Sequence, residues 1–153
     1  MAYLEKKILV AIPVTEAHKT YLEKQASSGK YNCQFRYIPK EHVTKEDLED
    51  TQVLIGNLPP ALVREAKRLE WLQLNSAGAD PYTPEGVLPA GAVLTNATGA
   101  YGLAVSEHML AILLALYKHL PAYRDQQSSH IWADRGPVST LHGKTVLIGG
   151  AGD

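Results

Sequence analysis

The sequence predicts an α/β protein with a small doubly wound parallel sheet over roughly residues 1–98. Two observations support this fold class. Short apolar runs of strand type alternate along the chain with helix-like segments, and turns of small residues follow several of the runs. The composition also fits a folded protein, because 45% of the 153 residues are hydrophobic and 20% are charged.

Five apolar runs are predicted to form the strands of this sheet. They are residues 8–12, 33–38, 53–56, 71–74 and 92–95. Pro13 stops the first run, because proline has no N–H to donate to a strand ladder. Their separation by helical segments is the pattern of repeated βαβ units.

Helical segments fill the intervals between the strands. Residues 16–28 form a charged amphipathic stretch, and Gly29 stands where such a helix would end. Thr44 is predicted to cap a short helix whose first turn contains Glu46, where negative charge suits the helix dipole. Pro60 opens the next helix, because proline is accepted at the first helical position.

The most apolar segment, residues 102–120, is predicted to be one helix that Pro121 ends. Residues 109–117 are apolar almost all round, so we expect burial on more than one side. We therefore expect this helix to pack against a second domain, a second subunit, or both. A central core helix is less favoured, because the sheet already has helices for both faces. The apolar run is too short to span a bilayer.

Three turns that follow predicted strands are candidate ligand sites, because open α/β sheets bind ligands at the carboxyl ends of their strands. The turns are residues 56–59, 75–80 and 96–99. Successive small residues allow backbone N–H groups to form an anion-binding concavity. Ser76, Ala77 and Gly78 are the clearest such run. The alternative is that small residues only permit tight turns.

Charge and cysteine content exclude several classes of function. Fifteen basic against sixteen acidic residues give a net charge of −1, so nucleic acid is not expected as a partner. Cys33 is the single cysteine, which excludes a disulfide framework and fits a reducing, cytoplasmic setting. The N-terminal residues lead into a strand without a signal-peptide core. None of the six histidines has metal-site spacing, so no metal is expected.

The last residues of the chain suggest part of a cofactor motif. Residues 145–148 are an apolar, β-rich run that leads into a glycine turn. Dinucleotide-binding units carry G-x-G-x-x-G at this place, and Gly150 and Gly152 supply its first two glycines. The third would fall past Asp153. The motif is weak by itself, since a floppy glycine-rich tail is the alternative.

Taken together, these motifs resemble the NAD-dependent D-isomer-specific 2-hydroxyacid dehydrogenases. The residues that match are, in order, SAGAD at 76–80, VLTNATG at 93–99, SEH at 106–108, Trp132, and LHGKTV at 141–146. The resemblance extends from about residue 50 to the end of the chain. Each motif is unspecific singly, but their order and spacing together are quite specific.

The resemblance implies a two-domain enzyme of which this chain is an N-terminal fragment. Residues 1–98 would be a flavodoxin-like substrate domain, and residues 99–140 an interdomain and dimerisation segment. Residues 141–153 would hold the first strand and half glycine motif of a truncated Rossmann domain. Residues Gly102 to Leu120 would join two copies in a homodimer.

The resemblance also implies a chemistry: hydride transfer between NAD or NADP and a small 2-hydroxy or 2-oxo acid. The backbone amides of Ala77 and Gly78, beside Ser76, would hold the substrate carboxylate. Leu58 is a fainter candidate for the substrate side-chain pocket. The cofactor contacts implied are Val105 against the nicotinamide, and Gly150 and Gly152 at the pyrophosphate.

The sequence departs from the family where catalysis is concerned. The family's catalytic arginine, carboxylate and histidine would all follow Asp153, and no histidine present should inherit the catalytic role. We therefore expect this chain alone to be inactive as an oxidoreductase. The alternative is a non-catalytic binding or oligomerisation module derived from the same fold.

Overall fold

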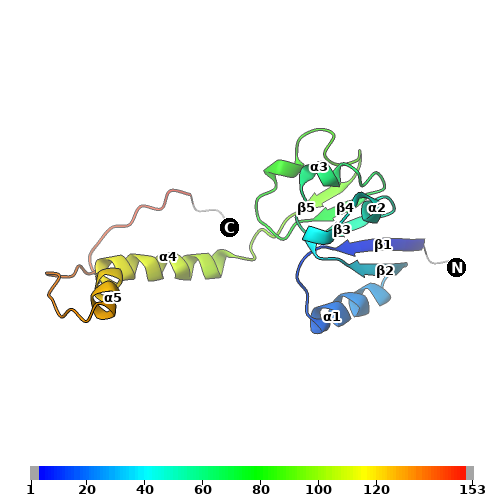
Figure 1. Ribbon diagram of the computed structural model, residues 1–153. Helices are drawn as coiled ribbons and strands as arrows, with labels where there is room; N and C mark the ends of the chain where they lie inside the picture. The colour runs from blue at the N-terminus through cyan, green and yellow to red at the C-terminus, as the bar shows by residue number, and fades with distance from the viewer. Residues whose placement is uncertain (1–3, 151–153) are drawn as a thin grey trace. The chain divides into compact units, whose positions relative to one another are not determined.

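The structure, a computed structural model, describes residues 4–150 of the chain. It divides into two compact units, Met1–Thr98 and Gly99–Asp153. The first unit contains all the strands and most of the helices, whereas the second contains two helices and an irregular segment (Figure 1). The two units are described separately below.

The first unit is built on a five-stranded sheet in which every pair of neighbouring strands is parallel. Its strands are β1 (Leu4–Val10), β2 (Tyr31–Tyr37), β3 (Val53–Ile55), β4 (Trp71–Gln73) and β5 (Val93–Thr95), in the spatial order β2-β1-β3-β4-β5. The predicted doubly wound parallel sheet is thereby confirmed. The strand order reverses between β1 and β3, and this switch point is where open α/β sheets bind ligands.

One row of leucines crosses the sheet and forms its core. Leu9 pairs in register with Leu54, Leu54 with Leu72, and Leu72 with Leu94. Residues in register place their side chains on the same face of a sheet, because side chains alternate along each strand. Leu9, Leu54 and Leu72 are 0% exposed. This row therefore fixes the relative heights of four strands.

Helices cover both faces of this sheet. On the leucine side lie α2 (Lys45–Leu48) and α3 (Pro60–Val63), whose Leu48 and Val63 belong to the core cluster. The longer α1 (Glu16–Ser27) lies on the opposite side, beside β2 (Figure 1). Two short 3₁₀ turns, η1 (Lys40–His42) and η2 (Asp80–Tyr82), complete the unit.

The predicted helix starts agree with the structure. Thr15 caps α1, with its hydroxyl accepting from the His18 N–H at 3.3 Å. Thr44 precedes α2, and its own N–H donates to an Asp47 carboxylate oxygen at 2.9 Å. Pro60 lies at the beginning of α3, where a missing N–H leaves no intrahelical hydrogen bond unmade.

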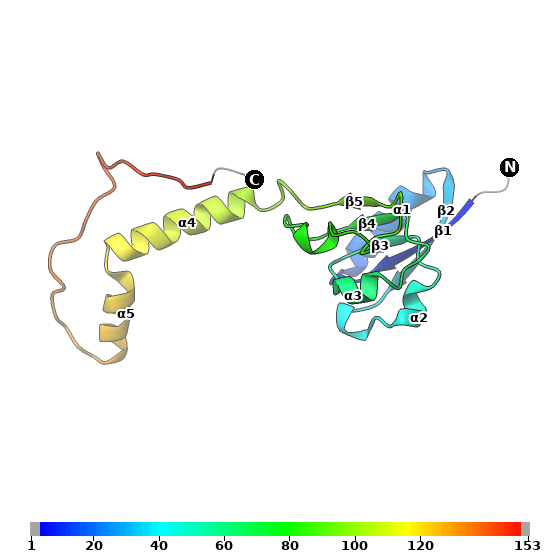
Figure 2. The same ribbon diagram turned by 90° about the horizontal axis from the view of Figure 1, so that it is seen from above.

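The second unit contains α4 (Gly102–Tyr117) and α5 (Leu120–Ser128), which meet at a bend of 65° (Figure 2). The prediction of one helix to residue 120 is therefore wrong at its end. His119 adopts a left-handed conformation with φ of 54°, which breaks the helix. Pro121 then lies in the first turn of α5, a position that proline favours, instead of only ending α4.

Within residues 4–150, no single helix is long and apolar enough to cross a bilayer. The bent pair α4 and α5 passes that test only when the two helices are combined. Length and composition alone are weak evidence for a membrane span.

The strand predicted at residues 145–148 is not formed. Described residues 129–150 contain no helix or strand, and Leu147 is 95% exposed. A strand is stable only when neighbouring strands satisfy its backbone N–H and C=O groups. The described part of the second unit has no strand with which residues 145–148 could pair.

Replacing Leu72 by alanine tests the leucine row. We expect the free energy of unfolding to fall by about 2–5 kcal/mol, because the change leaves a cavity in a fully buried site. Urea denaturation followed by circular dichroism measures the loss. Tyr21→Ala is the control: this side chain on α1 is 63% exposed, so its loss should change stability by no more than about 0.5 kcal/mol. Equal losses in the two variants would contradict the proposed core.

Candidate functional site

The three turns predicted as ligand sites lie together at the carboxyl edge of the sheet, where Asn57 joins the first two. Its side-chain Nδ2 donates to Ser76 Oγ at 2.7 Å, and its Oδ1 accepts from the Asn75 N–H at 2.9 Å. Asn57 follows β3, while Asn75 and Ser76 follow β4. A single amide side chain thus holds the turn after β4 against the turn after β3.

The third turn, after β5, is fastened to the same residues. Asn96 Nδ2 donates to the Ala77 carbonyl at 2.6 Å, and the Ala97 N–H donates to the Ser76 carbonyl at 2.9 Å. The Ser76 hydroxyl also donates to the Gly78 carbonyl at 2.9 Å. The run from Ser76 to Gly78 is therefore held by a hydrogen bond to the turn after β3, by hydrogen bonds to the turn after β5, and by a hydrogen bond within the run itself.

The backbone N–H groups of Ala77 and Gly78 remain available within this fixed turn. Neither donates a hydrogen bond to any acceptor in the described part of the chain. Ala77 is half-buried, Gly78 is exposed, and a Cβ at Gly78 would meet no atom within 4 Å. Consecutive N–H groups without acceptors are the elements of a backbone anion site.

The side chains that build this arrangement are poor candidates for proton transfer. Asn57, Ser76 and Asn96 carry amides and a hydroxyl, none of which ionises near neutral pH. Across residues 4–150, no group of three or more histidine, cysteine, aspartate or glutamate side chains could hold a metal ion. The donors that this arrangement presents are therefore the backbone N–H groups of Ala77 and Gly78.

Leu58 has a different environment from the other predicted substrate contacts. Its side chain is 1% exposed and belongs to the core cluster, and its carbonyl accepts from the Tyr82 hydroxyl at 2.8 Å. Burial raises the pKa of that tyrosine. The first unit therefore presents no open surface of the Leu58 side chain, and its role in a substrate pocket stays a prediction.

The predicted cofactor contacts belong to the second unit. Val105 lies in α4 and is 52% exposed. Gly150 has a φ of +98°, the conformation that favours glycine in a tight turn. Gly152 lies outside the described residues. All three assignments stay predictions.

A hollow of about 530 Å³ lies beside Asn57 and Asn75. Asn75 begins the turn of residues 75–80, hereafter the amide turn. Asn57 and Asn75 line the hollow, and so do Ile12, Val14 and Ile38 from the segments after β1 and β2. The motif search did not identify this feature, because its walls come from segments that are distant in sequence. The only local signal is that Pro13 and Pro39 each follow a strand closely.

Tyr37, at the end of β2, also lines this hollow. Burial, followed by the hydrogen bond from its hydroxyl to Glu23 at 3.1 Å, raises the pKa of Tyr37 to about 12. Lys19 lies over the ring, with Nζ 5.1 Å from its centroid. The phenol is thus neutral at physiological pH and acts as a wall of the hollow.

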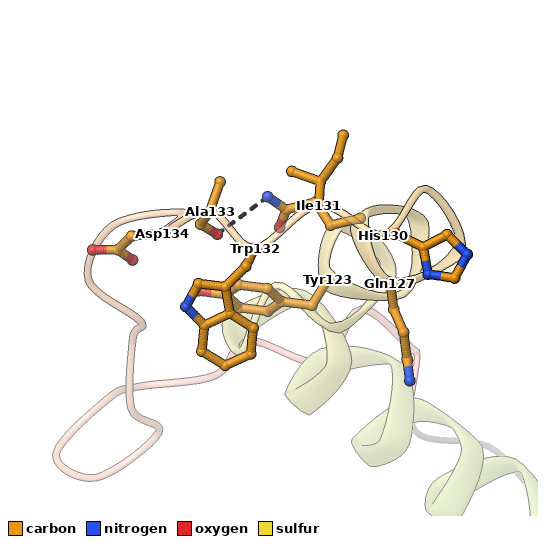
Figure 3. A pocket seen from close by; sticks show the side chains of 8 residues that line it. Tyr123, Gln127, His130, Ile131, Trp132, Ala133 and Asp134 are labelled. Carbon is orange, nitrogen blue, oxygen red and sulfur yellow. Dashed lines mark hydrogen bonds between the residues drawn. The ribbon is translucent and has the colours of Figure 1, made fainter.

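A larger hollow, of about 820 Å³, lies in the second unit beside α5 (Figure 3). Trp132 borders it and is fully exposed. Gln126 Nε2 donates to the Ala133 carbonyl at 3.1 Å, whereas His130 and Asp134 lie on opposite sides. Because these two titratable side chains are apart, this hollow offers no acid–base pair, and the smaller hollow is the better candidate site.

A parallel sheet of order 2-1-3-4-5 with helices on both faces defines an α/β fold of the flavodoxin-like class. Several of its solved structural neighbours are dehydrogenases. A D-isomer specific 2-hydroxyacid dehydrogenase family protein from Aeromonas salmonicida superposes with a TM-score of 0.68 and 25% identity, covering 94% of this chain and 44% of that one. The chain thus resembles that oxidoreductase family.

Two further similarities are more limited. D-lactate dehydrogenase from Aquifex aeolicus, whose structure holds NAD and lactic acid, gives a TM-score of 0.63 at 17% identity over 89% of this chain and 41% of that one, which shows the fold alone. An uncharacterized protein in the mprR 3′ region of Streptomyces coelicolor is 31% identical over 100 residues, 65% of this chain and 35% of that protein. No protein-family model matches the chain.

The chain therefore spans about a third of the length of the Streptomyces relative and less than half of each solved dehydrogenase chain.

Replacing Asn57 by alanine tests the connection between the turns. We expect the Asn75 amide to exchange with solvent at least about tenfold faster, because its hydrogen bond to Asn57 Oδ1 is lost. Hydrogen exchange followed by NMR measures the rate. Asn96→Ala is the matched control, since it removes a hydrogen bond to Ala77 but leaves the one at Asn75. Equal acceleration in both variants would show that Asn57 has no special role.

Proposed function

We propose that this chain binds a small 2-hydroxy or 2-oxo acid as part of an NAD- or NADP-dependent oxidoreductase. The observation that carries the proposal is the pair of N–H groups at Ala77 and Gly78, which have no acceptor among residues 4–150 and lie in a turn held by Asn57 and Asn96. The similarity at 25% identity to a D-isomer specific 2-hydroxyacid dehydrogenase family protein supports the same reaction class.

In this proposal the substrate carboxylate accepts hydrogen bonds from the amides of Ala77 and Gly78, beside the Ser76 hydroxyl. Hydrogen bonds from neutral donors to a charged acceptor are stronger than neutral pairs, and a fixed turn requires no reordering on binding. The carboxylate would hold the 2-carbon at the carboxyl edge of the sheet. Its recognition would not depend on the ionisation of any protein side chain.

The cofactor role of the second unit is also proposed. Val105 would contact the nicotinamide, and Gly150 and Gly152 would approach the pyrophosphate. At Gly150 the positive φ and the absence of atoms within 4 Å of a Cβ fit that role. When bound, the nicotinamide would supply the hydride. The described residues do not distinguish NAD from NADP.

We propose that this chain alone binds the acid without turning it over. The side chains that hold the turn by hydrogen bonds are those of Asn57, Ser76 and Asn96, and none of them ionises near neutral pH. A cytoplasmic location is proposed as well, on the basis of the single cysteine, Cys33.

A second candidate function is oligomerisation through α4. Apolar side chains that point in several directions around this helix are exposed: Leu103 76%, Met109 55%, Leu110 56%, Ile112 48% and Leu116 61%. A helix with apolar residues all round requires partners on more than one side. We propose that a second copy of the chain supplies one of them, giving a homodimer through Gly102 to Leu120.

Replacing Gly78 by proline tests the carboxylate site. The change removes one N–H donor, and we expect pyruvate to bind about tenfold more weakly, because a hydrogen bond to a charged group is lost. NMR titration of the ¹⁵N-labelled chain measures the affinity, and the Ala77 amide resonance should move in the wild type. Gly78→Ala keeps the N–H and has room for its methyl group, so it should bind like the wild type.

Proline and alanine variants that bind pyruvate equally would remove Gly78 from the site. The same samples, incubated with NADH and pyruvate, should show no loss of absorbance at the NADH band. Stoichiometric oxidation of NADH by the purified chain would contradict the proposed lack of turnover.

Replacing Leu110 by glutamate tests the homodimer. We expect the wild-type chain to be dimeric by light scattering and Leu110→Glu to be monomeric, because a charge would enter an apolar contact. Tyr21→Glu is the control, since Tyr21 is similarly exposed on α1 in the first unit. A monomeric wild type at micromolar concentration would overturn the proposal.

A further inference from the structure

The hollow beside Asn57 has the position and lining of a second part of the acid-binding site. We propose that it accommodates the side chain on the 2-carbon of the substrate, and that this side chain is uncharged and apolar, branched or aromatic. This inference rests on the proposed function, because it assumes that the carboxylate lies on the amides of Ala77 and Gly78. It adds the substrate class that the motifs leave open.

The hollow is continuous with the amide turn through two asparagines. Asn57 and Asn75 line the hollow, and the same two residues are joined by the hydrogen bond between the Asn75 N–H and Asn57 Oδ1. Ala77 is two residues beyond Asn75, so the Cα atoms of these two residues are at most about 7 Å apart, even in an extended chain. A substituent on a bound acid therefore has a short path into the hollow.

One part of the wall of the hollow is apolar and held in place. Ile12, Val14 and Ile38 are half-buried around it. The Ala11 N–H donates to the Ile55 carbonyl at 2.8 Å, and the Ile38 N–H donates to the Val10 carbonyl at 3.1 Å. These bonds continue the sheet pairing past the strand ends, so the segments that carry the walls are fixed before any ligand arrives.

The charged groups on the rim are paired with one another. Lys19 Nζ lies 2.7 Å from a Glu16 oxygen, and Lys40 Nζ lies 3.9 Å from a Glu41 oxygen. The Tyr37 hydroxyl is occupied by Glu23. Because each lysine faces a carboxylate, the rim has no unopposed cation for an anionic substituent. An uncharged side chain fits this balance better than a second carboxylate or phosphate.

The size of the hollow sets the length of the side chain. At about 530 Å³ it lies within the range of small-molecule sites, and a single methyl group would leave most of it unfilled. A carbon chain advances roughly 1.3 Å per bond, given C–C bonds near 1.5 Å, so a separation of at most about 7 Å corresponds to at most about five bonds. Two 2-oxo acids fall within this limit: the side chain of 4-methyl-2-oxopentanoate is branched and extends about three bonds from the 2-carbon, and that of phenylpyruvate is aromatic and extends about five.

The experiment compares pyruvate with these two larger acids by NMR titration of the full chain. We expect the larger acids to bind at least about tenfold more tightly than pyruvate, because several apolar carbons leave water. The methyl resonances of Ile12, Val14 and Ile38 should move with the larger acids but not with pyruvate. These wild-type readouts require no variant, so they decide the proposal even if a substitution impairs folding.

A matched pair of substitutions provides the control. Val14→Trp fills the hollow and should reduce the ratio of the affinities for phenylpyruvate and pyruvate to near one. Val93→Trp places the same bulky residue on β5, at a site that is 55% exposed and does not line the hollow, and should keep the ratio.

Two failures are distinguishable. If pyruvate moves the Ala77 and Gly78 amides but the larger acids bind no more tightly, the side-chain subsite is wrong and the proposed function stands. If no 2-oxo acid binds at all, the proposed function fails and this inference fails with it. Methyl shifts confined to residues away from Ile12, Val14 and Ile38 would also overturn the inference.

Discussion

The register of the parallel sheet is the constraint on which the rest of the first unit depends. Leu9, Leu54, Leu72 and Leu94 are aligned side by side, so burying one row of leucines sets the height of each strand. A shift of one residue would turn that strand's leucine to the other face, which makes the register strongly specified. Because the strands are in register, their carboxyl ends lie at the same edge of the sheet. The turns that follow the strands meet at this edge.

The binding arrangement follows from this shared edge. Asn57 reaches Ser76 and Asn75 only because β3 and β4 are neighbours in register. Its amide side chain uses both a donor and an acceptor, so neither backbone turn can move without breaking a hydrogen bond. The N–H groups of Ala77 and Gly78 thereby have fixed positions and no acceptor in the described part of the chain, which is the basis for proposing an anionic ligand there. Core packing thus determines where the three turns meet, and the turns determine which backbone N–H groups the proposed site would offer.

Local signals were sufficient for much of this fold. The apolar runs, Thr44 and Pro60 marked elements that the structure contains, because strand burial and helix capping are set by nearby residues. The pairing of Asn57 with Ser76 and the hollow beyond it depend on strand order, which no local pattern encodes. The break at His119 was missed because a left-handed histidine has no sequence signal. The run at residues 145–148 has the composition of a strand, but composition cannot supply the neighbouring strand that its backbone requires.

The two units differ in how far they account for their own stability. The first unit buries a cluster of leucines and valines, whereas in the described part of the second unit Gln126 is the one buried residue and no apolar side chain is buried. A 16-residue helix such as α4 has little stability from propensity alone, because most helical stability comes from packing an apolar face. The apolar side chains of α4 therefore require a surface that its own unit does not provide. This asymmetry separates the two proposed roles: the turns of the proposed acid site are held within the first unit, whereas the apolar side chains of α4 need a partner surface.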